Sequence, residues 1–289
     1  MIQYIFMRIS LIIPTFNAGQ HIEDLLSMLS AQDTKPWEII VVDSSSSDNT
    51  VDIAKRFGAR IILIPKQAFN HGKTRNLAAE EAKGDILVFM TQDALPHRNT
   101  LLSALTVPLE ACDIAASYGR HIPRVNASPL EIFARRFNYP DSPMTKSIDN
   151  IKDYGIKTFF FSNVCSAFKK DLFLRAGMFK EGVRANEDML IAARLILGGY
   201  KVAYVPGATV IHSHNHSLAQ QFKRYYNIGS SLKNNSWVLD YARPEGEGLR
   251  FIREQLAFVL KQHEYLWIPY IVLESLAKYT GYKAGLIAG

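Results

Sequence analysis

Acidic side chains follow directly after predicted strands of this chain, which makes them candidates for binding a ligand. Within residues 84–96, the apolar run of residues 86–90 predicts a strand buried on both faces, and Asp93 comes just after it. Asp43 ends the second predicted strand in the same way. Open α/β sheets bind ligands at this end of their strands. The alternatives are that Asp93 caps a helix beginning near Asn99 and that Asp43 caps the serine-rich turn after it.

The loop at residues 69–76 opens a predicted helix and carries Lys73 and Arg75. Backbone N–H groups at a helix start attract anions, and two cations beside them would strengthen that attraction. The loop is therefore a candidate phosphate site, with an ordinary solvated helix start as the alternative.

Two further groups of residues could transfer a proton or hold a metal ion. Asp188, in the sequence Asn186-Glu187-Asp188, is the best candidate for a general base, although acids at helix starts are usually capping groups. His212 and His214 are two residues apart in an extended segment, so they face the same side. They could bind a metal ion or hydrogen-bond a diphosphate, while each alone is more often a structural histidine.

Strand and helix alternate four times in about the first ninety residues. The strands are expected at residues 9–14, 38–43, 60–65 and 86–90, and the helices at residues 22–31, 51–57 and 73–82. This alternation predicts a mostly parallel sheet with right-handed crossovers. The polar loops at the carboxyl ends of the strands, which carry Asn17, Asp43, residues 71–75 and Asp93, should therefore gather on one edge of the sheet.

The rest of the chain is less regular. Further strands are expected at residues 114–118, 166–168 and 201–205, and further helices at residues 171–176 and 189–197. Residues 120–158 show few clear periods and are interpreted as an acceptor-side loop region. Beyond Leu218 the pattern is helical and rich in aromatic residues, and its longest uncharged run is residues 265–273. That run is far shorter than the roughly 20 residues of a membrane span, so it is either an interfacial helix or a packed core helix.

Composition narrows the classes of partner. The formal charge of +6 is spread over 289 residues and suits anionic substrates or an anionic membrane surface. We expect no nucleic-acid partner, because no nucleic-acid-binding motif is present. Two cysteines, Cys112 and Cys165, indicate a reducing, cytoplasmic compartment. Arg8 interrupts the N-terminal apolar run, so no signal peptide is visible; we expect Met7 to be the start and residues 1–6 a short extension.

Taken together, these motifs resemble the family 2 glycosyltransferases. The resemblance rests on Ile-Ile-Pro-Thr-Phe-Asn at residues 12–17, Val-Val-Asp-Ser-Ser-Ser-Ser-Asp-Asn-Thr at residues 41–50, the strand end at Asp93, and residues 186–188, in the family's order and spacing. It covers residues 7–215 and implies a GT-A domain, an α/β fold with a mostly parallel, Rossmann-like central sheet flanked by helices. Residues 216–289 would then be a C-terminal helical extension.

The resemblance also implies roles for individual residues. It assigns Asp188 as the catalytic base and a nucleotide-sugar site to Pro14, Thr15, Asn17, Asp43, Ser45, Lys73, Arg75, Gln92 and Asp93, with Asp93 at the diphosphate. The family's common Asp-x-Asp motif is reduced here to Thr91-Gln92-Asp93. A single carboxylate holds Mg²⁺ or Mn²⁺ weakly, so His212 or the diphosphate would have to complete the shell.

Within the family, residues 69–76 and 91–94 look most like bacterial rhamnosyltransferases of surface polysaccharide synthesis. The resemblance implies inverting transfer of L-rhamnose from dTDP-L-rhamnose to a glycan or lipid-linked glycan, on the cytoplasmic face of the inner membrane with peripheral attachment as an option. The alternatives are a UDP- or GDP-sugar donor with an acceptor such as polyprenyl phosphate, and a nucleotide-sugar-binding protein without catalysis. A sugar nucleotidyltransferase would open with a glycine-rich loop ending in Arg and Lys, which residues 15–19 lack.

Overall fold

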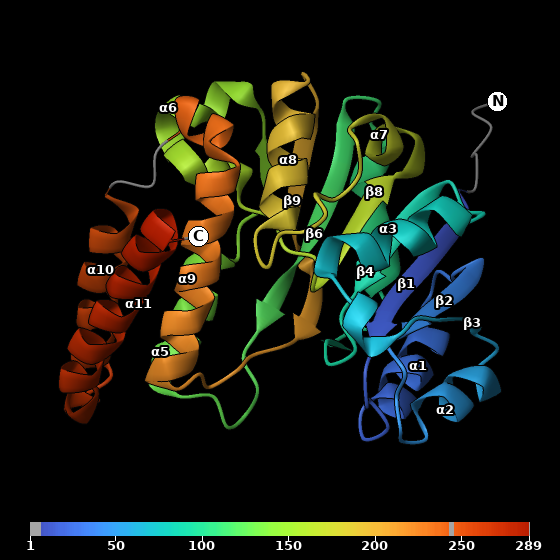
Figure 1. Ribbon diagram of the computed structural model, residues 1–289, viewed down its shortest axis with the longest axis horizontal. Coiled ribbons are helices and arrows are strands. Elements are labelled where there is room, and N and C mark those ends of the chain that lie inside the picture. Colours follow the sequence, from blue (N-terminus) through green and yellow to red (C-terminus); the bar gives the residue numbers. More distant parts are fainter. Residues whose placement is uncertain (1–6, 243–245, 289) are drawn as a thin grey trace.

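A computed structural model describes residues 7–242 and 246–288 of the chain (Figure 1). The expectation about residues 1–6 lies outside the described residues. The described part contains a nine-stranded sheet in the order β3-β2-β1-β4-β8-β6-β9-β5, with β7 paired to β9. The predicted α/β class with a largely parallel sheet is confirmed.

The N-terminal half of the sheet follows the sequence pattern closely. Four parallel strands, in the order β3-β2-β1-β4, alternate with helices on the faces of the sheet. The strands are β1 (Ile9–Thr15), β2 (Glu38–Asp43), β3 (Arg60–Leu63) and β4 (Ile86–Met90). The helices are α1 (Ile22–Ser30), α2 (Thr50–Arg56) and α3 (His71–Glu81), with the short turn η1 (Lys66–Ala68) before α3.

The second half of the sheet mixes strand directions. Strand β8 (Cys165–Lys169) is antiparallel to β4 and to β6 (Ile114–Ile122), which is parallel to β9 (Lys201–Ile211). Strands β5 (Leu95–Pro96) and β7 (Met144–Lys146) pair antiparallel to β9. The helices of this half are α4 (Leu101–Thr106), η2 (Val107–Glu110), α7 (Lys170–Arg175) and α8 (Glu187–Leu197).

Two of these strands run further than their sequence pattern predicted. The expected end of the last strand at Val205 is wrong because β9 continues through Pro206 and Gly207 in an irregularity of the β6–β9 ladder, where Gly119 pairs with Val205 and Arg120 with Thr209. This bulge extends β9 to Ile211 and β6 to Ile122. The extension matters because it carries histidine side chains to the edge of the sheet where Asp93 lies.

The interpretation of residues 120–158 as a loop region is wrong for its middle part. Helix α5 (Pro129–Asn138) begins there, capped by the side chain of Ser128, which accepts a hydrogen bond from Glu131 N. It is followed by β7 and by three short helical turns, η3 (Ile148–Asn150), α6 (Ile151–Tyr154) and η4 (Gly155–Phe159).

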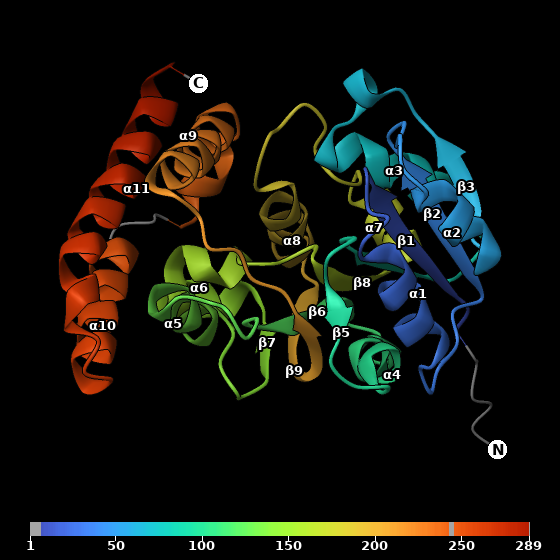
Figure 2. The ribbon, with the colours of Figure 1, turned by 90° about the horizontal axis from the view of Figure 1, so that it is seen from below.

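The two faces of the sheet bury separate cores. Successive side chains of a strand point to opposite faces, so Ile12 packs with α3 and α8 while Leu11 and Ile13 pack with α1 and α4. Figure 2 shows α3 and α8 on one side of the sheet and α1 and α4 on the other. The predicted stripe of α1 is confirmed, since its apolar side chains Ile22, Leu25, Leu26 and Leu29 are buried.

The C-terminal extension is helical, as predicted, and lies beside the end of the molecule opposite β3 (Figures 1 and 2). It consists of α9 (Leu218–Asn234), η5 (Ser236–Asp240), α10 (Glu247–Lys261), η6 (Tyr265–Trp267) and α11 (Ile268–Ala288). Helix α11 packs along α9 and keeps an exposed face. Among the described residues, no helix combines the length and apolar character needed to cross a membrane. The division into two domains at residue 215 stays a prediction.

Candidate active site

The loops after β1, β2 and β4 bind one another at the carboxyl edge of the sheet. Thr15 Oγ1 donates to Asp43 Oδ2 at 2.8 Å, and both side chains are buried. The Gln92 amide accepts from Phe16 N at 2.8 Å and donates to Phe16 O at 3.2 Å. Asn17 Oδ1 accepts from the main chain of the second loop at residue 47, at 2.9 Å. The predicted nucleotide residues of these loops are therefore brought together.

The contacts of Asp43 are those of a loop-capping group. Its two oxygens accept from Ser46 N and Ser46 Oγ at 2.8 and 2.6 Å as well as from Thr15. The alternative named for Asp43, capping of the serine-rich turn, describes this arrangement. Ser45, in the left-handed region with φ 61°, donates to Ile64 O at 2.9 Å, and Pro14 lies within β1. Nucleotide binding by these residues stays a prediction.

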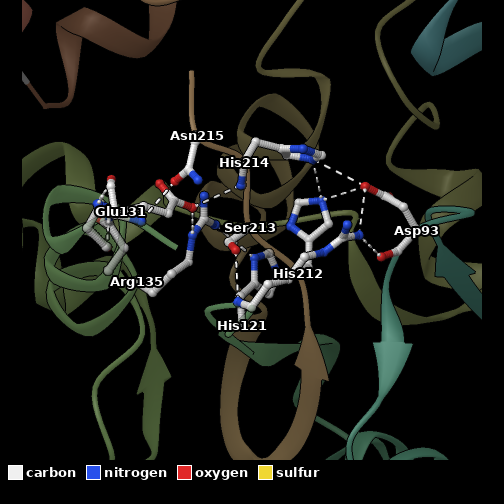
Figure 3. A network of polar contacts seen from close by, with 12 residues as sticks. Asp93, His121, Glu131, Arg135, His212, Ser213, His214 and Asn215 are labelled. Carbon is white, nitrogen blue, oxygen red and sulfur yellow. Dashed lines mark hydrogen bonds and ion pairs between the residues drawn. The ribbon is translucent and has the colours of Figure 1, made fainter. Parts of the chain in front are cut away.

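Asp93 and two histidines form a compact group, here called the Asp93 cluster (Figure 3). Asp93 Oδ2 lies 3.2 Å from His214 Nε2 and 3.6 Å from His212 Nε2, and the two histidine nitrogens are 3.1 Å apart. Arg124 donates to Asp93 O at 3.0 Å and lies 3.8 Å from Asp93 Oδ2. Capping by Asp93 is wrong, because the first N–H groups of α4 donate to the side chain of Gln32.

Burial sets the charges of the cluster. It lowers the pKa of His212 to about 3, so this side chain is neutral at pH 7 and its ring nitrogens can act as ligands. Burial alone would raise the pKa of Asp93, but the hydrogen bond with His214 and the neighbouring imidazoles bring it well below its usual range, so Asp93 is ionised at pH 7.

The donor set of the cluster fits a divalent metal ion. One ligand atom each from Asp93, His212 and His214 lie within 4.8 Å of one another. The predicted pair of Asp93 and His212 is thus joined by His214, as the two-residue histidine spacing allowed. Two imidazoles with one carboxylate suit a transition ion such as Mn²⁺ better than Mg²⁺, which prefers oxygen ligands.

Asp188 stands at the start of α8 and is a further carboxylate at this edge. Its Oδ1 accepts from Met189 N at 2.8 Å and its Oδ2 from Asn163 N at 3.3 Å. Burial and the adjacent Glu187 raise the pKa of Asp188 to about 7. Part of the side chain stays exposed to solvent. A carboxylate tuned to neutral pH can accept a proton from a hydroxyl group.

Hydrogen bonds place Asp188 and the Asp93 cluster at the same end of the β4–β8 pair. Thr91 N donates to Val164 O at 3.2 Å, so the start of β8 lies beside the segment that carries Asp93. Asn163, the residue before Val164, holds Asp188. A candidate base and a candidate metal site therefore share one edge of the sheet.

The loop before α3 is less open than predicted. The side chain of Asn70 accepts from Gly72 N and Lys73 N at 3.2 and 3.1 Å, which leaves these N–H groups unavailable to a phosphate. This corrects the expectation of a backbone phosphate site. Arg75 is buried, donates to His71 O at 2.8 Å and lies 3.7 Å from Glu187. It belongs to the surroundings of Asp188, while the Lys73 side chain is exposed; diphosphate binding by the two cations stays a prediction.

Comparison with known proteins identifies the family of this chain. A model described as glycosyl transferase family 2 matches residues 10–176, more than half of the chain. The chain belongs to glycosyltransferase family 2. This glycosyltransferase is 40% identical over 279 residues to the O-antigen chain rhamnosyltransferase WbaN of Salmonella anatum, covering 96% of this chain and 88% of that protein. It is 39% identical over 282 residues to RfbN of Salmonella typhimurium, with coverages of 96% and 90%.

Solved structures of other glycosyltransferases share the fold. The mannosyltransferase PcManGT from Pyrobaculum calidifontis, in complex with GDP-Man and Mn²⁺, superposes with a TM-score of 0.64 at 20% identity, over 98% of this chain and 85% of that one. TarS from S. aureus, in complex with UDP-GlcNAc, gives a TM-score of 0.61 at 17% identity, with coverages of 98% and 91%. The predicted GT-A fold is thereby confirmed.

The sequence reasoning missed the side chains that hold the histidines of this glycosyltransferase. Glu131 Oε1 accepts from Arg135 Nε at 2.6 Å and from His214 N at 3.3 Å, and Arg135 Nη1 lies 3.3 Å from His121 Nδ1 (Figure 3). A usable signal existed for α5, where Ser-Pro-Leu-Glu at residues 128–131 is a helix-start pattern. No local pattern pointed to His121 or Arg124, which reach the site through the longer β6 and the loop after it.

Proposed function

We propose that this glycosyltransferase transfers L-rhamnose from dTDP-L-rhamnose, with inversion, to a glycan or lipid-linked glycan acceptor. The observation that carries the mechanism is the placement of a carboxylate with a near-neutral pKa, Asp188, at the same edge as the Asp93 cluster. The identity of the donor is supported by the 40% identity to a protein named as an O-antigen chain rhamnosyltransferase.

The reaction is a single displacement. Asp188 accepts the proton of the acceptor hydroxyl while its oxygen bonds to the anomeric carbon of the sugar, and the bond from that carbon to the diphosphate breaks. The nucleoside diphosphate leaves with the bonding electrons. One base suffices, because no covalent sugar–enzyme intermediate forms. Arg124 beside Asp93 is placed to supply positive charge near the leaving diphosphate.

The same proposal gives the remaining predicted residues their roles. Asp93, His212 and His214 would hold a divalent ion, which supplies Lewis acidity at the diphosphate when bound, and their donor set favours Mn²⁺ over Mg²⁺. The strand-end residues would hold the nucleotide: Pro14, Thr15, Asn17, Asp43, Ser45 and Gln92.

A donor screen tests the function. Purified protein is offered dTDP-rhamnose and matched UDP- and GDP-sugars, and release of nucleoside diphosphate is measured with and without a glycan acceptor. We expect the fastest acceptor-dependent release from dTDP-rhamnose. Faster release from a UDP- or GDP-sugar would contradict the assigned donor, and binding of every donor without release would favour the non-catalytic alternative.

Peripheral membrane contact is proposed for the exposed face of α11. Large apolar side chains stand out on it, with Val272 62%, Leu276 57% and Tyr279 61% exposed, and Lys283 lies exposed next to them. These positions recur at helical spacing, so they form one stripe that suits the boundary of an anionic bilayer.

Sedimentation with phosphatidylglycerol-containing vesicles tests the contact. We expect binding at low salt, release at high salt because surface charges are screened, and loss of binding in Leu276→Glu. The matched control is Leu63→Glu, an exposed apolar residue on β3 at the far end of the sheet. Wild-type protein that stays in the supernatant at low salt would contradict the proposal.

A further inference from the structure

A cavity of about 470 Å³ lies between the sheet domain and the C-terminal extension. Its walls come from α5, from the segment of residues 214–217 that follows β9, and from α9, α10, η6 and α11. We propose that this cavity is the acceptor site and that it binds an uncharged saccharide. The inference rests on the proposed function, because it assigns the second substrate of that reaction.

The position of the cavity meets the requirement of the reaction. His214 forms part of its wall and contacts Asp93 at 3.2 Å. Tyr139 forms another part and is hydrogen-bonded to Ser162, the residue before Asn163, whose N–H donates to Asp188. The cavity therefore borders the metal-binding cluster and the segment that holds the base. An acceptor must lie there to attack the anomeric carbon.

The lining has the composition of a carbohydrate site. Six aromatic side chains contribute to it: Tyr139, Phe160, Tyr225, Phe251, Trp267 and Tyr270. The lining also contains two ion pairs, Glu131 with Arg135 at 2.6 Å and Glu274 with Lys278 at 3.2 Å. A pyranose ring carries apolar C–H faces and a rim of hydroxyl groups, so it can pack on the rings and hydrogen-bond to the charged groups.

Other ligands fit this lining less well. A hydrocarbon chain would remove the charged side chains from water without offering them a hydrogen bond, which costs free energy. A ligand with several negative charges would face Glu131 and Glu274 as well as the cations. Each of these carboxylates is paired with a cation, and Arg224 of α9 also lines the cavity. The lining therefore offers both donors and acceptors, which suits a ligand that itself donates and accepts hydrogen bonds.

The extension supplies most of this aromatic surface. Tyr225 lies on α9, Phe251 on α10, Trp267 in η6 and Tyr270 on α11, and all four lie beyond residue 176, where the family match ends. The extension would therefore select the acceptor, while the matched part of the chain provides most of the sheet.

Tryptophan fluorescence tests the proposal directly. The chain has three tryptophans, so Trp37→Phe with Trp237→Phe leaves Trp267 as the only indole. We expect methyl hexopyranosides to change its emission in a saturable way, and we expect Tyr270→Ala to weaken that response. The matched control is Tyr279→Ala, on the same helix but exposed and outside the cavity. Trp267 emission that changes with nucleotide but with no hexoside would overturn the assignment of the cavity as an acceptor site.

Steady-state kinetics with a glycan acceptor provide a second test. Removing the Tyr270 ring should raise the KM for a glycan acceptor about tenfold, since one aromatic contact is worth about that factor. The affinity for the donor and the slow hydrolysis of donor without acceptor should stay as in the wild type. An unchanged KM in folded Tyr270→Ala protein would overturn the acceptor site. If the wild type releases nucleotide from no sugar donor, the proposed function fails, whereas the hexoside titration still decides whether the cavity binds sugar.

Discussion

The two halves of the site are built in opposite ways. The strand-end half comprises the loops after β1, β2 and β4, whose side chains are largely engaged with each other and with main chain, as in Thr15 with Asp43 and Gln92 with residue 16. The helix-lined half comprises α5, residues 212–217 and the C-terminal helices, and it presents aromatic rings and ion pairs to a cavity. Backbone geometry fixes the first half, whereas side-chain packing forms the second, so substitutions should separate them.

The largest effect is expected for Asp188, the candidate base. Asp188→Asn should lower the rate of transfer by about 10²- to 10⁴-fold, the usual contribution of a general base, with donor affinity nearly unchanged. Kinetics and calorimetric titration with donor nucleotide measure both quantities. The matched control is Asp171→Asn, an exposed acid in the first turn of α7. Transfer within about tenfold of the wild type would remove Asp188 from this role.

The pH dependence tests the same residue. The folded-state pKa of Asp188 is raised to about 7, so the base is protonated in acid and kcat/KM should rise with pH until about pH 7. A raised pKa stabilises the fold at low pH, and that contribution is lost as pH rises through the folded value. The melting temperature of Asp188→Asn should therefore fall less between pH 5 and pH 9 than that of the wild type. A flat rate profile below pH 7 would contradict the assignment.

A somewhat smaller loss is expected at the Asp93 cluster. Asp93→Ala should weaken donor binding and reduce turnover by about 100-fold, because a bound metal contributes several kcal/mol at the leaving group. His212→Ala should do the same less severely. Electron paramagnetic resonance titration with Mn²⁺ reads the site without turnover, and Asp113→Ala, an exposed acid paired with Lys201, is the control. Full activity in excess EDTA would show that catalysis needs no bound metal ion.

An intermediate effect is expected where the two halves meet. Glu131 accepts from the main chain of His214 and pairs with Arg135, which reaches His121, so it positions the histidines from the wall of the cavity. Glu131→Gln should weaken Mn²⁺ binding about tenfold, as expected when a group that orients a metal ligand is altered. Glu254→Gln, on the exposed face of α10, should bind Mn²⁺ like the wild type. Equal Mn²⁺ affinity in both variants would contradict this positioning role of Glu131.

The smallest catalytic effect is expected deep in the helix-lined half. A Cβ at Gly285 of α11 would lie 2.1 Å from Tyr226 O, so the two helix backbones would have to separate. Gly285→Ala should lower the free energy of unfolding by about 1–3 kcal/mol with little change in donor affinity. Gly248→Ala on α10 meets nothing within 4 Å and should be neutral or stabilise by less than about 1 kcal/mol. Equal melting temperatures would contradict the close packing of α9 and α11.

The two halves also differ in how much of their structure the sequence could predict. Strands β1 to β4 and their helices were predictable because each is a local pattern: a run of apolar residues, a helical stripe such as that of α1, a polar loop. Parallel strands place their carboxyl ends at one edge, so the gathering of Asp43 and Asp93 followed from topology. Helix α5 was missed, although Ser128 and Pro129 mark its start and its apolar side chains recur at helical spacing, because the proline and charged residues around it obscure that pattern.

The sequence by itself determined the family, the order of the first four strands and the candidates Asp93 and Asp188, since these depend on residue type and on contacts close in the chain. Only the tertiary structure decided how His214 joins Asp93, because a bulge opposite Gly119 extends β9 past Pro206 and no local pattern specifies that register. The raised pKa of Asp188, about 7, also depends on the tertiary structure, because burial is its main cause. The cavity has the same origin: its wall joins residues from 128 to 278, and side chains so distant in sequence meet only when the helices pack.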